Sequence, residues 1–319
     1  MFKAIAYDDI KSFISITESD DFDEHQMTDW GIYLLDRYSL LEKCCYFGAV
    51  QCFKYLITEF EVVITKRCLE LSFLGGNADI MSKCFKKIEP DKECMKYAII
   101  SHNIDFITFL MYEKQLTIDV NDCIYYHNLK AFLVHFDQAN DINEILFHSL
   151  SFNILSLYKY LVHQGANINA KGNGEKTVLQ YAVERNNIEI AQVFISLGAD
   201  VNVQLKYGRT AFINAMNQNY KEMMELLIEN GADVNIRDIW GATALHYAVQ
   251  QNSKEKIEFL LSNGAQIDAK DKEGFTALLR AIEKDNIEMF ELLYSHGADI
   301  HSTNNNEYNV LHFAAQKIS

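Results

Sequence analysis

Gly231-Ala232-Asp233-Val234-Asn235, followed by Gly241-Ala242-Thr243-Ala244-Leu245-His246-Tyr247-Ala248, is the stretch that decides the fold. Its Gly-Ala pair recurs every 33 residues from Gly165 to Gly297, and an alanine stands 17 residues after each of these glycines. Apolar residues at helical spacing precede each following pair. This period predicts stacked repeats with two short helices each. The glycine would supply the left-handed turn after the second helix, and the alanine would let two helices pack closely.

The stretch resembles the ankyrin repeat, and the resemblance covers residues 165–319, with 231–263 as the best-matching unit. The unit 198–230 departs from the family pattern, with Leu205 where Asp is usual and Phe212-Ile213 where Leu-His is usual. We therefore expect the hydrogen bonding of that one turn to differ, but not the fold. The resemblance implies a hairpin-shaped loop, here called a finger, between successive units. It also implies a concave groove lined by these fingers and by the first helix of each unit.

Shorter units of the same kind are predicted in the first half. Segments that enter a second helix align at Gly48, Gly76, His102, His127 and Phe152, with spacings of 28, 26, 25 and 25 residues. We interpret them as helix pairs that lack about seven residues of the finger. Residues 39–160 resemble the domain of unknown function that precedes the array in large ankyrin families of parasitic protists. That likeness is carried by Ser39-Leu40-Leu41-Glu42-Lys43-Cys44-Cys45-Tyr46, Leu71-Ser72-Phe73-Leu74-Gly75-Gly76-Asn77 and Met95-Lys96-Tyr97-Ala98-Ile99-Ile100-Ser101-His102-Asn103-Ile104-Asp105.

The predicted fold is an all-α solenoid with short β-hairpin fingers only in the second half. Three segments are expected: a helical and acidic lead-in over 1–38, degenerate short repeats over 39–160, and ankyrin repeats over 161–319, the last one incomplete. The lead-in combines an apolar stripe from Phe2 to Ile14 with an acidic loop. The acids of that loop are Glu18, Asp20, Asp21, Asp23 and Glu24. Because the chain ends at Ser319, before the second helix of its last unit could form, we expect either that the natural product continues with further repeats or that the chain is a fragment or a truncated gene model.

The charge of the chain argues against several kinds of partner. Its net charge is −15, and no run of basic residues occurs, which disfavours nucleic acid and anionic membrane surfaces. Asp8 and Asp9 stand where a signal peptide needs apolar residues, and no apolar run of about 18 residues occurs. We therefore expect an intracellular, cytoplasmic protein without direct membrane insertion.

The seven cysteines all lie in the first half, their number is odd, and no CxxC pair occurs. A zinc site or disulfides remain alternatives, but the missing ligand spacing and the apolar neighbours favour buried thiols. Buried thiols indicate a reducing compartment. The sequence predicts no metal site and no cofactor.

Candidate catalytic groups each have a structural interpretation. His246 and His312 are either general bases or, as the ankyrin resemblance implies, ties between a helix and a neighbouring turn, and no nucleophile is spaced to pair with them. The periodic carboxylates are interpreted as a solvated ladder: Glu189, Glu222, Glu255 and Glu288. The segment 172–177 fails as a phosphate-binding loop because Ala170 replaces its first glycine. We predict a protein without catalytic residues.

The predicted function is protein binding by a monomeric scaffold, through residues that vary while the repeat frame is kept. The family resemblance places them around the finger and just past the first helix, as Tyr207, Arg209, Ile239, Trp240, Lys272, Phe275, Arg185, Gln218 and Gln251. Exposed aromatic rings favour an interface, although packing on the neighbouring finger is an open alternative. Alternative functions are a substrate-recruiting subunit of a larger enzyme and a membrane-cytoskeleton adaptor.

Overall fold

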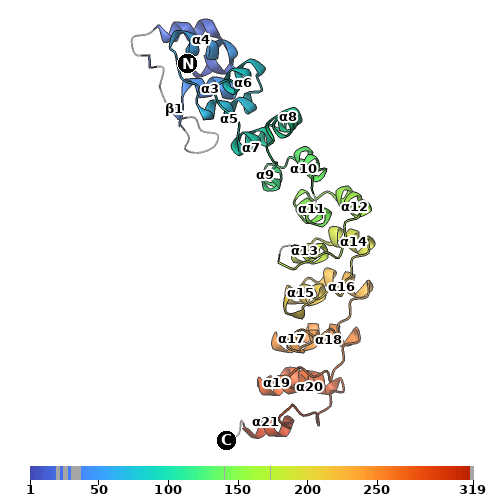
Figure 1. Ribbon diagram of the computed structural model, residues 1–319. Coiled ribbons are helices and arrows are strands. Elements are labelled where there is room, and N and C mark those ends of the chain that lie inside the picture. The colour runs from blue at the N-terminus through green and yellow to red at the C-terminus, as the bar shows by residue number, and fades with distance from the viewer. Residues whose placement is uncertain (19–21, 24–27, 30–36, 140, 173, 317–319) are drawn as a thin grey trace. The chain divides into compact units, whose positions relative to one another are not determined.

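The computed structural model describes residues 1–18, 22–23, 28–29, 37–139, 141–172 and 174–316. The chain divides into two compact units, Met1–Asn140 and Asp141–Ser319. Helices dominate both units (Figure 1), as the sequence predicts for an all-α solenoid. None of the helices in the described part of the chain is long and apolar enough to span a bilayer.

The first unit is built from helix pairs. Its elements are α1 Phe2–Ala6, α2 Ile10–Thr17, β1 Thr28–Asp29, β2 Arg37–Tyr38, α3 Leu40–Phe47, α4 Val50–Glu59, α5 Lys66–Gly75, α6 Ala78–Phe85, α7 Lys92–Ile100, α8 Ile104–Lys114, α9 Val120–Tyr125 and α10 Leu129–Phe136. The first helices of successive pairs pack on one another, α3 on α5, α5 on α7 and α7 on α9. The predicted short units are therefore helix pairs, and each pair buries the apolar face of the pair before it.

Left-handed residues set the register of the turns inside these pairs. Gly48, Gly76, His102 and His127 have φ of 68°, 65°, 54° and 53°, at the positions aligned from the sequence. The fifth such residue is Asn153, with φ of 54°, and not Phe152. The alignment is wrong by one residue there because a 3-10 turn, η1 Leu150–Phe152, prolongs the preceding helix.

The cysteines of the first unit are all free and buried. Burial, the largest effect, raises the pKa of Cys123 to about 12, and the nearby acids Asp122 and Asp119 act in the same direction. Among the described residues, no group of three or more His, Cys, Asp or Glu side chains is placed to hold a metal ion. The cysteines contribute to the core as small apolar side chains.

The predicted acidic lead-in is described only in part. Asp20, Asp21 and Glu24 lie outside the described residues. Thr28 pairs with Tyr38 in an antiparallel ladder of β1 and β2, so the placing of hairpins only in the second half is wrong. The guanidinium of Arg67 lies 5.1 Å from the Tyr38 ring centroid and anchors β2 on α5.

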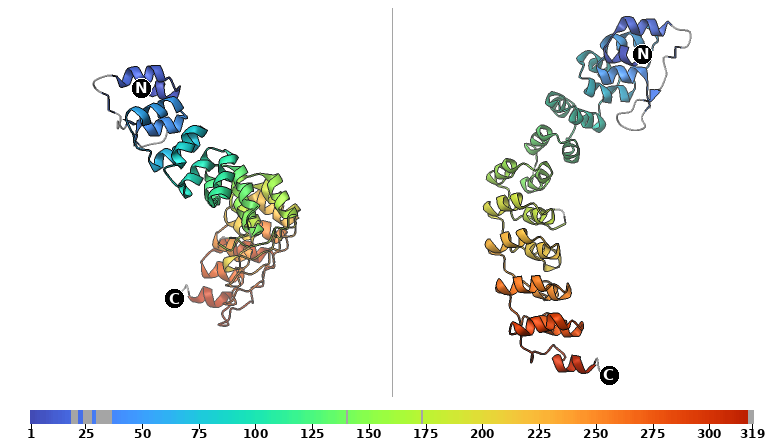
Figure 2. Two further views of the ribbon diagram at one scale, coloured as in Figure 1. Left: turned by 45° about the horizontal axis from the view of Figure 1, so that its top comes forward. Right: turned by 180° about the vertical axis from the view of Figure 1, so that it is seen from behind.

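The second unit is a stack of helix pairs whose layers follow one another along the chain (Figure 2). Its elements are α11 Ile142–Ser149, η1, α12 Leu155–His163, α13 Val178–Glu184, α14 Ile188–Ser196, η2 Lys206–Gly208, α15 Ala211–Asn217, α16 Lys221–Glu229, α17 Ala244–Gln250, α18 Lys254–Ser262, α19 Ala277–Glu283, α20 Ile287–Ser295 and α21 Val310–Gln316. First helices α13, α15, α17, α19 and α21 contact one another in series.

The periodic residues hold this stack together in the predicted way. Threonines precede α13, α15, α17 and α19, and the Thr177 hydroxyl accepts a hydrogen bond from the N–H of Gln180, which caps α13. Ala248 is fully buried between helices. Gly231 has φ of +86° after α16, the left-handed conformation that glycine adopts without strain.

The fingers between the layers contain no strand among the described residues from 165 onward. Each is a tight turn, as where the N–H of Asp238 donates to the carbonyl of Ala242 at 3.0 Å. Among the described residues, three pairs of adjacent fingers each share one backbone hydrogen bond, such as Lys272 N–H to the Trp240 carbonyl at 2.9 Å. One bond per pair of fingers does not make a ladder, which is why the predicted β-hairpins are not observed.

Candidate functional site

Aspartates fix the finger turns that carry the candidate site. Asp238 Oδ1 accepts hydrogen bonds from the N–H groups of Trp240 and Ala242, both at 2.9 Å. Gly241 has φ of +75°, and a Cβ built on it would lie 2.8 Å from the backbone nitrogen of Lys272 in the next finger. The fingers therefore stack with backbone against backbone, and the residue before the glycine is directed outward.

The finger of the unit 198–230 is held differently, as its departure from the family pattern predicts. Leu205 has no side-chain acceptor, and the turn keeps its backbone bond from Leu205 N–H to the Arg209 carbonyl at 2.8 Å. Gln204 Nε2 donates instead to the carbonyls of Gly208 and Arg237, at 3.0 and 2.8 Å. The fold is unchanged because a neighbouring side chain ties this finger to the next.

Two predicted site residues meet on the finger tips. The rings of Tyr207 and Trp240 stack with centroids 5.7 Å apart and an interplanar angle of 18°. Both remain about half exposed, at 48% and 50%. Lys206 Nζ lies 5.2 Å from the Tyr207 centroid, and Ile239 beside it is exposed. The rings therefore pack on the neighbouring finger, and a large part of each still faces solvent, so the interface interpretation stays a prediction.

Phe275 differs from the other two aromatic residues because its ring is buried. It is 7% exposed, and the Phe313 ring lies 5.6 Å away between centroids. The Arg280 guanidinium covers it at 3.9 Å. The structure therefore places Phe275 beneath the surface and leaves its neighbour Lys272 exposed.

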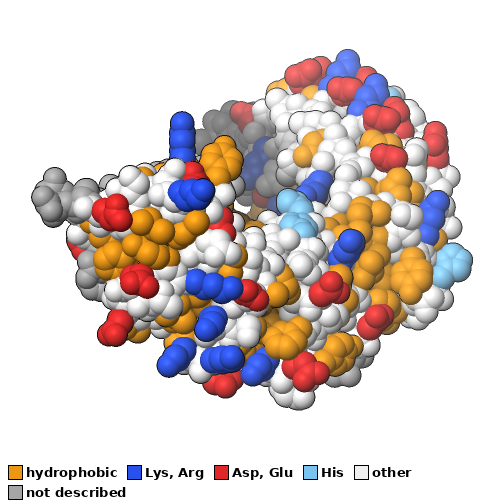
Figure 3. Space-filling view, turned by 90° about the horizontal axis from the view of Figure 1, so that it is seen from above, with side chains coloured by type: hydrophobic (Ala, Val, Ile, Leu, Met, Phe, Trp, Pro, Cys, Tyr) orange, Lys and Arg blue, Asp and Glu red, His pale blue; other side chains and the backbone are white. Residues whose placement is uncertain are grey.

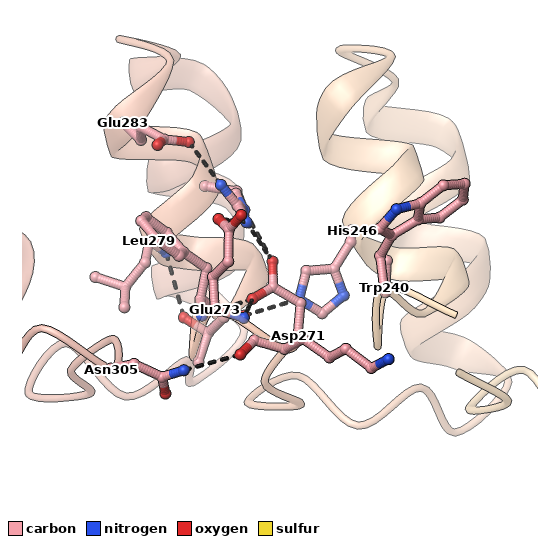
Figure 4. Close-up of polar contacts among 12 residues, drawn as sticks. Trp240, His246, Asp271, Glu273, Leu279, Glu283 and Asn305 are labelled. Carbon is pink, nitrogen blue, oxygen red and sulfur yellow. Dashed lines mark hydrogen bonds and ion pairs between the residues drawn. The ribbon is translucent and has the colours of Figure 1, made fainter. Parts of the chain in front are cut away.

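Arg280 is a residue that the sequence reasoning missed. Its guanidinium donates to Asp271 Oδ2 at 2.6 Å, to Glu273 at 2.6 Å and to Glu283 at 3.1 Å (Figure 4). Partial burial alone would lower the pKa of Arg280, but these three carboxylates outweigh it and hold the pKa above its usual value. The signal in the sequence was a lone arginine between acids, at a position where Tyr247 stands one unit earlier.

His246 ties its helix to the next finger, as the structural interpretation predicts. Its Nδ1 accepts from the N–H of Thr243 at 3.1 Å, so Nε2 carries the proton and donates to the Phe275 carbonyl at 3.0 Å (Figure 4). Burial, the largest effect, lowers the pKa of His246, although the bond to Phe275 opposes it. The imidazole is neutral and both of its nitrogens are engaged, which suits a structural role.

The predicted helix-side residues form a row at the ends of the first helices. Arg185, Gln218 and Gln251 directly follow α13, α15 and α17, and all three are exposed. Gln251 Nε2 donates to Asn217 Oδ1 at 2.8 Å, and the Arg185 guanidinium lies 4.3 Å from the ring centroid of Tyr181. This row faces outward beside the fingers.

Two cavities lie between the fingers and the row of residues that follows the first helices. The larger, of about 450 Å³, is lined by Arg209, Trp240, Ala242, His246, Tyr247, Val249, Gln250, Asp271, Glu273, Arg280 and Lys284. The smaller, of about 330 Å³, is lined by Val183, Glu184, Arg209, Asn214, Asn217, Gln218 and Tyr220. Of the predicted residues, Arg209, Trp240 and Gln218 line these cavities. Tyr207 is joined to them through its stack on Trp240, whereas Ile239, Lys272, Phe275, Arg185 and Gln251 line neither.

Comparison with known families agrees with this geometry. A model described as ankyrin repeats in three copies matches residues 123–205, 146–238, 179–271 and 212–304, together more than half of the chain. The chain belongs to the ankyrin-repeat family. A second model, described as a domain of unknown function, matches residues 60–135, ahead of most of the repeats. A search of curated proteins finds no match.

Ankyrin repeats are protein–protein interaction modules and are generally non-catalytic, which agrees with the two engaged nitrogens of His246. We call residues 165–316 the ankyrin array. On the face shown in Figure 3, basic and acidic side chains of the described residues are interspersed and do not separate into one strongly charged field.

Proposed function

We propose that the chain is a non-catalytic, monomeric scaffold that binds a partner protein in the groove between the fingers and the first helices of the ankyrin array. The observation that carries the proposal is the stacked pair of Tyr207 and Trp240, half exposed beside a cavity of about 450 Å³. Aromatic side chains left in solvent are unfavourable unless a partner covers them. Large, rigid rings beside a pocket are also frequent hot spots of interfaces.

The frame around the pair supports a binding role because it is rigid. Asp238 fixes the turn that carries Trp240, and His246 joins α17 to the finger of the next unit. A ring held in place before binding loses little conformational entropy when a partner docks. The free, buried cysteines support an intracellular, cytoplasmic location.

Proximity labelling followed by binding of the identified partner tests the proposal. The chain is fused to a biotin ligase in its native cell, and the labelled partner is purified and titrated calorimetrically. We expect Trp240→Ala and Tyr207→Ala each to weaken binding by more than about 1 kcal/mol. The identity of the partner also distinguishes a scaffold from a substrate-recruiting subunit and from a membrane-cytoskeleton adaptor.

The matched control is Tyr294→Ala, since Tyr294 is 55% exposed on α20, away from both cavities. It should leave binding unchanged. If both groove variants bind at wild-type strength and melt at lower temperature, the two rings are packing residues and the groove proposal fails.

A further inference from the structure

Arg209 has a partly buried guanidinium that forms no ion pair with an acid in the described part of the chain. Its Nε is shielded from solvent and has no hydrogen-bond partner in the structure. The guanidinium lies 5.3 Å from the ring centroid of Tyr247, whose hydroxyl donates to Asp238. A buried donor without an acceptor is unfavourable in the free protein, and a ligand that supplies the acceptor gains that energy on binding.

The position of Arg209 makes it central to the groove. It lines the cavity of about 450 Å³ together with Trp240, and it also lines the cavity of about 330 Å³ together with Gln218. A chain segment that lies along the groove through both cavities therefore passes over this guanidinium. The stack of Tyr207 on Trp240 stands at the edge of the same path.

The acids that line the two cavities are already engaged. Asp271 and Glu273 accept hydrogen bonds from Arg280, and Glu184 pairs with Lys176 at 2.8 Å. Glu175, on the first finger, is an exposed acid outside both cavities.

Several cations of the groove, in contrast, have no acid partner. In the larger cavity Lys284 pairs with no acid of the described chain, and the same holds for the exposed side chains of Lys206, Lys272 and Arg185 beside the groove. The unpaired charge in the groove is therefore positive, within a chain whose net charge is −15.

We propose that the groove binds an extended acidic segment of a partner protein, one of whose carboxylates pairs with Arg209. This inference rests on the proposed groove function and adds the chemistry of the partner. An arginine fork forms two parallel hydrogen bonds with a carboxylate and supplies the geometry that a lysine lacks. Lys284 and Lys206 complement further acids along the segment, and a flanking flat side chain covers the stack of Tyr207 on Trp240.

Single-stranded nucleic acid is the competing occupant, because its bases stack on aromatic rings and its phosphates suit arginine. The charge of the whole chain favours the peptide. The second helices of the array carry a periodic series of acids, Glu189, Glu222, Glu255 and Glu288. A long polyanion that needs many phosphate contacts is repelled by them, whereas a short acidic segment meets only the cations of the groove.

Selection from a random display library of short peptides on the full chain, at physiological salt, tests the inference. Selected peptides are synthesised with a fluorescent label, together with versions in which Asn and Gln replace Asp and Glu, and anisotropy measures their affinities. We expect acid-rich peptides whose affinity falls by about tenfold with Arg209→Gln. The amide versions should bind weakly. Their affinities for the wild type and for Arg209→Gln should be equal, because without a carboxylate on the peptide the pair with Arg209 is already lost.

The matched control is Arg237→Gln, since Arg237 is an exposed arginine that lines neither cavity. It should retain the wild-type affinity, and circular dichroism checks that both variants are folded. Neutral or basic peptides, no selected peptide at all, or tighter binding of poly(U) RNA than of the acidic peptides would each overturn the inference. If the selected peptides lose affinity with Trp240→Ala but not with Arg209→Gln, only the inference of an acidic partner is overturned. If they lose affinity with neither variant, the proposed binding in the groove is overturned as well.

Discussion

His246→Ala should destabilise the middle of the ankyrin array, and no catalytic activity should be lost with it. His246 is 7% exposed and bonds the N–H of Thr243 at 3.1 Å and the Phe275 carbonyl at 3.0 Å. Its loss leaves a donor and an acceptor without partners, at about 1–3 kcal/mol for each such group in a dry site. Because His246 lines a cavity of about 450 Å³, water can reach these groups. We therefore expect a total cost of about 2 kcal/mol.

Another unit of the array suggests a variant, His246→Gln, that should restore the lost hydrogen bonds. Gln180 holds the equivalent position two units earlier in the stack, at Thr177 instead of Thr243. It caps its helix in the same way, and it also ties that helix to the next finger, although at a different carbonyl of that finger. Its Oε1 accepts from the N–H of Thr177 at 2.7 Å, and its Nε2 donates to the Val203 carbonyl at 3.0 Å. His246→Gln should therefore recover most of the stability lost in His246→Ala.

The pH dependence of stability separates the wild type from both variants. Burial lowers the pKa of His246 below its ordinary value of 6.5, so the unfolded chain binds this proton more readily than the folded chain. The stabilising contribution is fully present above pH 6.5 and is lost as the pH falls through the folded pKa. The difference in stability between wild type and His246→Gln should shrink or reverse in acid.

Urea titrations followed by circular dichroism, at neutral and at acidic pH, measure these differences. A repeat array unfolds in parts, so hydrogen exchange at α17 and α19 accompanies them. Equal stability of His246→Ala and wild type at neutral pH would refute the reasoning, as would a His246→Gln variant no better than His246→Ala. A melting temperature unchanged in His246→Ala, together with loss of a catalytic activity, would contradict the structural role itself.

Three further substitutions test the frame of the array. Ala248→Leu should cost about 1–3 kcal/mol by overpacking, because Ala248 is fully buried, whereas Gln250→Leu on the exposed side of the same helix should cost little in the same urea titration. Gly231→Ala should cost about 1 kcal/mol for its left-handed φ alone, and Gly241→Ala should cost more because its Cβ would lie 2.8 Å from the Lys272 nitrogen. Equal melting temperatures of these two glycine variants would contradict the close stacking of the fingers.

The helical frame could be predicted because its determinants are local and repeated. The left-handed φ of Gly231 and the threonine caps each depend on a few neighbouring residues, so a 33-residue period is enough to find them. The same holds for His102 and His127 in the short units. The alignment fails at Asn153 because one extra helical turn, which no periodic residue marks, shifts the register.

The exposure of the site residues could not be predicted from the period. Trp240 and Phe275 both flank a finger glycine, yet one is half exposed and the other is 7% exposed. Phe275 is covered by Arg280 of the helix that follows it, α19, and by Phe313 of the next unit, whereas Trp240 stacks on a finger of the preceding unit. Such cover comes from side chains that differ between units, and a repeat pattern carries no information about them.

The sequence by itself therefore determined the stack of helix pairs, the threonines and glycines that begin and end its helices, and the structural interpretation of His246. Only the tertiary structure decided which groups line the two cavities, and that Arg209 lies between them with a buried Nε and no acceptor. The physical reason is the distance along the chain over which each feature is determined. A turn or a cap is fixed by backbone conformation over a few residues, while the burial and pairing of a side chain depend on whichever neighbours adjacent units bring against it.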